Sequence, residues 1–162
     1  MGSAQASPRS IEIHSGDVAS EFPNYPLDEL PNLCQAWQDK SWHNDVCPSF
    51  VTRIEAGGRT YLPVLWCEYP DPALRELPGQ ARLMVVIYDV TDDEDRDCYY
   101  RGEHEFVAGG ETINDLIRLL IEDAPDDAYL VRENDANMEG VRLHKAVAHR
   151  AARLAAEVPT AS

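Results

Sequence analysis

The sequence predicts an α+β fold: an antiparallel β-meander of about four strands, with one face covered by a central amphipathic helix and a long C-terminal helix. An apolar, β-branched run at residues 82–90 lies between Pro78-Gly79 and an acidic segment, as expected for a buried strand. The strand-like segments follow one another with short connections, which antiparallel pairs allow. The helical patterns come after the strands, which favours helices packed on one face of a sheet.

The length of 162 residues is typical of one domain. We expect residues 1–10, which are small and polar, to form a disordered N-terminal tail and residues 11–162 to form a single α+β domain. At this size about 70% of the unfolded surface can be buried, so a core forms without a disulfide or a metal ion.

The first half of the chain predicts two paired strands after an irregular N-terminal segment. Ile11–His14 alternates like a short edge strand, and Pro31–Asp39 has the spacing of a short helix. Ser49–Glu55 and Thr60–Tyr69 read as strands joined by a hairpin turn, because the adjacent glycines between them supply positive φ. Pro63 lies inside the second strand and therefore predicts an edge position or a bulge.

The second half predicts one more strand pair and two helices. Cys98–Val107 reads as the partner of the buried strand, and Ala128–Arg132 as a short further strand. Thr112 and Asp115 form a capping-box pattern ahead of apolar residues at helical spacing, which predicts the central amphipathic helix. The C-terminal helix is expected over Met138–Val158. Its predicted apolar stripe consists of Val141, Val147, Ala148, Ala151, Leu154, Ala155 and Val158.

The charge of the chain is strongly acidic, with 29 Asp and Glu against 14 Lys and Arg and a net charge of −15. Such a field repels nucleic acid and anionic membranes and attracts basic partners. We therefore expect a basic protein surface as the partner, with no direct nucleic-acid binding and no membrane binding. The C-terminal helix is the one net basic segment, and it is the surface through which a homodimer would form.

Cysteine usage and targeting signals indicate the compartment. None of the four cysteines lies in a Cys-x-x-Cys pair, and residues 1–10 contain no apolar signal segment. No apolar run approaches the roughly 18 residues of a membrane span. A cytoplasmic protein with reduced thiols is the expectation.

One stretch carries the residue types of catalysis. Trp42, His43, Asp45 and Cys47 place an aromatic ring, an imidazole, a carboxylate and a thiol in a non-periodic loop. His43 is a potential base for the Cys47 thiol, with Asp45 orienting the imidazole. Catalytic Cys and His usually come from distant segments, so a structural loop with an inert Cys47 is the competing interpretation.

A second candidate surface is the acidic segment after the buried strand. It would steer a basic partner, while neighbouring aromatic rings supply contact area. The residues expected to bind here are Asp92, Asp93, Glu94, Asp95, Tyr99 and Tyr100. The segment lacks the alternating carboxylates and central glycine of an EF-hand loop. The spacing of Cys34, His43, Cys47, Cys67 and Cys98 matches no common zinc pattern, so no metal or other cofactor is expected.

Two functions remain open from the sequence. The first is a non-catalytic acidic interaction protein, acting as a nucleic-acid mimic or an inhibitor, that engages a basic protein surface. The alternative is a small enzyme or ligand-binding domain that uses the loop of His43, Asp45 and Cys47.

Overall fold

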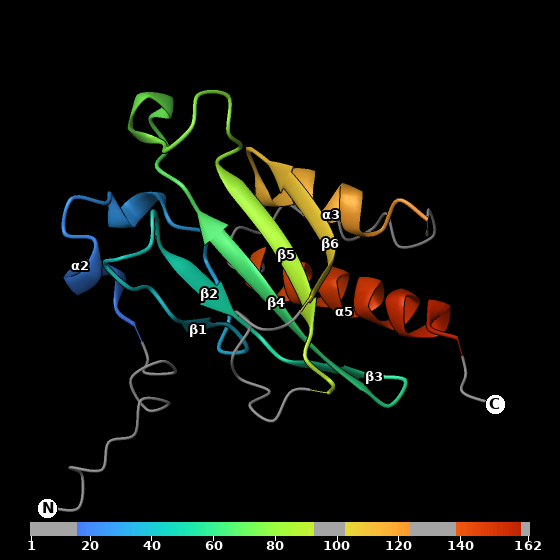
Figure 1. Cartoon of the computed structure of the whole chain (residues 1–162). Helices are drawn as coiled ribbons and strands as arrows, with labels where there is room; N and C mark the ends of the chain where they lie inside the picture. The colour runs from blue at the N-terminus through green and yellow to red at the C-terminus, as the bar shows by residue number, and fades with distance from the viewer. Residues whose placement is uncertain (1–15, 93–102, 124–138, 160–162) are drawn as a thin grey trace, which may run out of the picture.

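A computed structural model describes residues 16–92, 103–123 and 139–159. Within these ranges the chain forms a six-stranded antiparallel sheet in the order β1-β2-β4-β5-β6, with β3 also paired to β4. Figure 1 shows α3 and α5 together behind this sheet. The expected α+β architecture, including helices on one face and a long C-terminal helix, is therefore confirmed. The expected tail 1–10, Ile11–His14 and Ala128–Arg132 lie outside the described residues.

The bounds of the elements follow the chain. The strands are β1 (Gln38–Asp39), β2 (Ser49–Val51), β3 (Ile54–Ala56), β4 (Arg59–Cys67), β5 (Leu83–Asp89) and β6 (Glu103–Gly110). The α-helices are α2 (Val18–Glu21), α3 (Ile113–Leu120) and α5 (Glu139–Glu157), and two short 3₁₀ helices cover Leu27–Glu29 and Pro72–Leu74.

Strand β4 is central in the sheet, which corrects the edge position expected from Pro63. Strands β2 and β3 pair with β4 on one side, and β5 pairs with it on the other. The backbone N–H of Thr52 donates to the Pro63 carbonyl at 3.1 Å. In an antiparallel strand the carbonyl and the nitrogen of one residue point to the same side, so the Pro63 nitrogen, which has no hydrogen to donate, also faces the neighbouring segment that contains Thr52. That neighbour is interrupted between β2 and β3. The proline is therefore tolerated where the partner ladder is already broken.

The turn between β3 and β4 has the conformation predicted for it. Ala56 pairs with Arg59, and the two residues between them, Gly57 and Gly58, have φ values of 58° and 77°. Both angles lie in the left-handed region that a two-residue hairpin requires and that glycine adopts without a steric penalty.

Strand β5 is buried on both faces, as its apolar sequence predicts. Leu83, Val85 and Ile87 face the helices and have exposed fractions of 0–2%. Val86 is on the opposite face and is only 8% exposed. Its neighbours there form a second apolar cluster made of Val51, Leu62, Val64 and Val90, with Trp66 and Tyr88 packed against them.

Helix α3 is the amphipathic helix that the sequence predicts. The Thr112 hydroxyl accepts a hydrogen bond from the Asp115 N–H at 3.1 Å, and the Asp115 carboxylate accepts one from the Thr112 N–H at the same distance. This reciprocal capping box begins the helix. Its apolar face, made of Ile113, Leu116, Ile117 and Leu120, is buried in the main core.

Helix α5 packs against α3, β3 and β4 mostly with the predicted stripe: Val147 and Ala151 are buried, and Ala148, Leu154 and Ala155 pack against the main core. Leu143 is 0% exposed although the pattern omitted it, and Val141 and Leu154 are only half-buried. Arg142 and Arg150 lie outside the apolar stripe in the sequence, yet they are only 5% and 9% exposed. Their guanidinium groups reach hydrogen-bond acceptors on α3: the Asn114 side chain and the Leu120 carbonyl.

The short helix predicted over Pro31–Asp39 is absent, since this described segment is irregular until β1 begins. The segment is fixed by α5 instead. The Trp37 indole donates to the Gly140 carbonyl at 3.2 Å, and the Gly140 N–H donates to the Asn32 carbonyl at 2.9 Å. A Cβ on Gly140 would lie 2.3 Å from the Cys34 nitrogen, so this close approach requires glycine.

Candidate functional site

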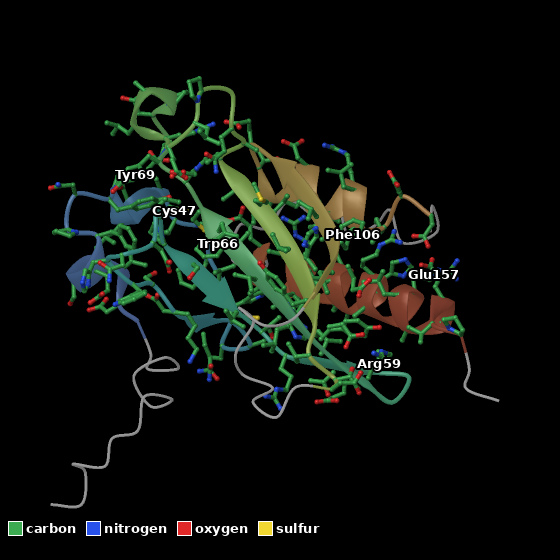
Figure 2. All side chains as sticks on the ribbon, in the orientation of Figure 1. Cys47, Arg59, Trp66, Tyr69, Phe106 and Glu157 are labelled. Carbon is green, nitrogen blue, oxygen red and sulfur yellow. The ribbon has the colours of Figure 1, made fainter. Side chains whose placement is uncertain are left out.

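A pocket of about 310 Å³ lies at one end of the sheet face that carries the second apolar cluster. Figure 2 shows two of its residues, Cys47 and Trp66, next to each other at that end of the sheet. The described residues lining it come from the loop between β1 and β2, from β4 and β5, and from the segment before β5. They are Asn44, Asp45, Val46, Cys47, Trp66, Gln80 and Met84.

The loop that supplies four of these residues is held at both ends. The Lys40 N–H donates to the Ser49 carbonyl at 2.9 Å, which closes the loop where β1 meets β2. The buried Ser41 hydroxyl accepts from the Ser49 N–H at 3.2 Å. A turn inside the loop is closed by the Asp45 N–H, which donates to the Trp42 carbonyl at 2.8 Å. These hydrogen bonds position residues 44–47 next to the sheet face.

The side chain of His43 is directed to Glu21, outside the pocket. Its Nδ1 lies 2.9 Å from the Glu21 Oε1, and its backbone N–H donates to the same oxygen at 3.0 Å. The Trp42 ring packs edge-on against the imidazole, with centroids 5.9 Å apart. The predicted grouping of His43, Asp45 and Cys47 is thus divided: the structure brings Asp45 and Cys47 to one pocket and ties His43 to α2.

Cys47 is a buried thiol with an exposed fraction of 1%. Burial raises its pKa, and the nearby Glu68 and Asp45 carboxylates raise it further, because they disfavour a thiolate. Nucleophilic cysteines need the opposite environment, with a lowered pKa. The surroundings of Cys47 therefore favour a protonated, packed side chain.

Asp45 is the acidic group that lines the pocket. Its Oδ2 is buried and has no hydrogen-bond partner. Burial raises the pKa of this carboxyl above its ordinary value. A buried carboxylate oxygen without a donor is costly, so a donor or a cation beside Asp45 would stabilise the ionised form.

Glu68 is a second acidic residue near the pocket that the sequence did not single out. It is 2% exposed, and its two carboxylate oxygens accept hydrogen bonds from the Tyr69 and Glu76 backbone N–H groups, each at 3.3 Å. Trp66 and Met84 were missed as well, although they face each other across β4 and β5. Side chains alternate between the two faces of a strand, so Trp66 and Met84 can be assigned to one shared face only once the register between β4 and β5 is known.

The acidic segment begins at the opposite end of β5. Asp89 accepts hydrogen bonds from the Arg59 Nε at 2.8 Å and from the Thr91 hydroxyl at 2.6 Å, and Asp92 is exposed beyond it. The lowered pKa of Asp89 reflects these hydrogen bonds, which outweigh the opposing effect of burial. The other predicted residues of this surface, Asp93, Glu94, Asp95, Tyr99 and Tyr100, lie outside the described residues.

In the described ranges, no three His, Cys, Asp or Glu side chains are grouped so as to hold a metal ion. In the same ranges, no helix combines the length and apolarity needed to cross a membrane. Comparison with known proteins gives no matching family model, no significantly similar curated protein and no significantly similar solved structure.

Proposed function

We propose that this protein is a non-catalytic acidic interaction protein that binds a basic protein surface, as a nucleic-acid mimic or an inhibitor does. A net charge of −15 on 162 residues attracts cationic partners over long range and repels nucleic acid and anionic lipid. Such a field mainly accelerates association and selects partners by charge. A reducing cytoplasm suits this protein, because Cys34, Cys47 and Cys67 are free thiols.

The observation that carries this proposal is that arginine side chains bind groups within the fold. Arg75 donates to the carbonyls of Tyr69, Pro70 and Gln80 and also pairs with Glu111. Arg150 is buried against α3 and β6.

The exposed carboxylates are distributed differently, over the outside of the fold. They include Asp28, Glu29, Glu55, Asp71, Glu76, Asp92, Glu105, Glu122 and Glu157. Arg142 and Arg150 are 5% and 9% exposed, so these two positive charges offset the exposed carboxylates less than surface cations would.

Contact area for a partner is present beside these charges. On the sheet face opposite the helices, Trp66 and Tyr88 are half-buried. Val46 on the pocket rim is 45% exposed, and Val107 of β6 is 51% exposed. Apolar and aromatic groups surrounded by polar ones are the composition of a protein interface.

The acidic groups at the Arg59 end of the sheet provide the sharpest test. Asp89 and Asp92 act electrostatically on Arg59, and Glu105 acts on Tyr61. We would neutralise three exposed carboxylates here with Glu55→Gln, Asp92→Asn and Glu105→Gln. The matched control carries Asp28→Asn, Glu122→Gln and Glu157→Gln, which remove the same charge elsewhere.

Immobilised wild-type protein should capture basic proteins from a native lysate at low salt and release them at high salt. The first triple variant should capture less than the control at equal ionic strength. If capture by the wild type is independent of salt, or if the captured proteins are not basic, the proposal is wrong.

The pocket also supports a second candidate, a ligand-binding domain that uses the loop of His43, Asp45 and Cys47. The catalytic form of this candidate is disfavoured by the raised pKa of Cys47 and by the contact of His43 with Glu21. His43→Ala should therefore affect stability without changing binding. Loss of an activity by a folded His43→Ala variant would favour the catalytic form.

A further inference from the structure

The pocket next to Asp45 has the features of a site for one basic side chain. We propose that it receives a lysine or arginine of the basic partner, with the charged group beside Asp45 and the methylene stem along Trp66 and Met84. This inference rests on the proposed function and gives it a specific anchor point on the surface.

The first argument is the charge of the pocket. Asp45 lines it, and no described lining residue is basic. Glu68 lies close enough to act on the Cys47 thiol, which is part of the pocket wall. Two carboxylates near one concave surface make it complementary to a cation and repel an anionic ligand.

The second argument is the unsatisfied Asp45 carboxylate. Its Oδ2 is buried without a hydrogen-bond donor, while the residue as a whole is only half-buried and faces the pocket. A guanidinium or ammonium group in the pocket would offset the cost of the ionised form at close range. A cation bound here would therefore stabilise the ionised form of Asp45.

The third argument is the apolar part of the wall. Trp66 and Met84 are directly opposite each other on β4 and β5, and Val46 completes the wall from the loop. Lysine and arginine place their methylene stems on apolar surfaces while the charged group reaches a polar one. An aromatic face also attracts a cation, and the flexible methionine adapts to the stem.

The size of the pocket favours a single side chain. Its volume of about 310 Å³ is at the lower limit of the roughly 300–1,000 Å³ found for small-molecule sites. A divalent metal ion is a poorer occupant, because Asp45 is the only carboxylate among the described lining residues.

The experiment titrates the full-length protein with the peptide acetyl-Gly-Arg-Gly-amide and with its lysine analogue. Backbone amide signals are followed by ¹H–¹⁵N NMR. The controls are the citrulline and acetyl-lysine peptides, which keep the shape and lose the charge. Saturable shifts at residues 44–47, Trp66 and Met84 with the charged peptides alone are expected. Shifts that scatter over the acidic surface, or no shifts, would overturn the inference.

Two variants test the role of Asp45. Asp45→Asn removes the charge without breaking a hydrogen bond to Oδ2, so the fold should persist, and the peptide should bind about tenfold more weakly. Val46→Lys places a cation of the chain itself at the exposed rim and should abolish binding. The control Glu157→Gln removes one charge at the end of α5 distant from the pocket (Figure 2) and should bind like the wild type.

The outcome is separable from that of the proposed function. If the wild type captures basic proteins in a salt-dependent way but the peptides do not bind the pocket, the interaction function stands and this anchor is wrong. If the peptides bind with the expected Asp45 dependence but no basic protein is captured, the pocket is a cation site and the proposed function is wrong.

Discussion

The guanidinium carbon of Arg150 lies 5.0 Å from the centroid of the Phe106 ring, so a cation of α5 is seated on an aromatic side chain of β6. The same guanidinium donates from Nε to the Leu120 carbonyl at 3.0 Å and from Nη2 to Asp123 at 2.9 Å. One side chain thereby joins the sheet, α3 and α5.

Replacing Arg150 should weaken this junction. Arg150→Ala is expected to lower the free energy of unfolding by about 2–3 kcal/mol, the scale of a charge-assisted hydrogen bond together with a desolvated cation–π contact. Arg153 is the matched control, since it also pairs with Asp123 but its side chain is 55% exposed. Arg153→Ala should cost about 0–1 kcal/mol in urea unfolding. Equal losses would contradict a distinct role for the buried arginine.

Acid should weaken the same junction through Asp123. Hydrogen bonding from His149 and the charge of Arg150 lower the pKa of Asp123 from 3.8 to about 2. Because the folded-state pKa is below the unfolded one, this stabilisation is present above about pH 4 and is lost as the pH falls toward 2. Between about pH 4 and pH 2, thermal unfolding should show a smaller loss of stability for Asp123→Asn than for the wild type. Glu122→Gln, an exposed neighbour, should follow the wild type.

The core of α3 is testable with two leucines of the same helix. Leu116 is 0% exposed and Leu119 is 39% exposed. Leu116→Ala should cost about 2–5 kcal/mol, because a buried leucine leaves a cavity. Leu119→Ala should change the stability by about 0.5 kcal/mol or less. A loss below about 1 kcal/mol at Leu116 would place α3 outside the core.

The contact of α5 with the β3–β4 hairpin predicts unequal costs at two adjacent glycines. Gly57 and Gly58 both have positive φ, so alanine should cost about 1–2 kcal/mol at either position. A Cβ on Gly57 would also lie 2.9 Å from the Ala155 Cβ of α5, while one on Gly58 meets no atom within 4 Å. Gly57→Ala should therefore unfold at the lower urea concentration. The reverse order would contradict the docking of α5 on this hairpin.

The cysteines should differ in reactivity. Cys47 and Cys67 are buried, and burial raises the pKa of Cys67 to about 12, whereas Cys34 is half-buried. In a Cys98→Ser background, a thiol reagent should label Cys34 first in the folded protein and three thiols after unfolding. The unfolded wild type, without reductant, should report all 4 cysteines as thiols. A count of two or fewer would show disulfides and contradict a reducing compartment.

The local sequence alone determined several parts of this structure. The paired glycines determined the hairpin, Thr112 and Asp115 determined where α3 begins, and the apolar run determined β5, because each depends on backbone preferences or burial within a few residues. The net charge, and with it the expected class of partner, is likewise a property of composition.

Other features were decided only by the tertiary structure. Pro63 is tolerated in the central strand β4 because the partner strand is interrupted beside it. The segment Pro31–Asp39 is irregular because Trp37 and Asn32 form hydrogen bonds with Gly140, about a hundred residues away in the sequence. The pocket depends on the register that sets Trp66 opposite Met84 and on the loop that adds Asp45. Contacts between distant segments depend on the free energy of the whole fold, and local periodicity carries no information about that pairing.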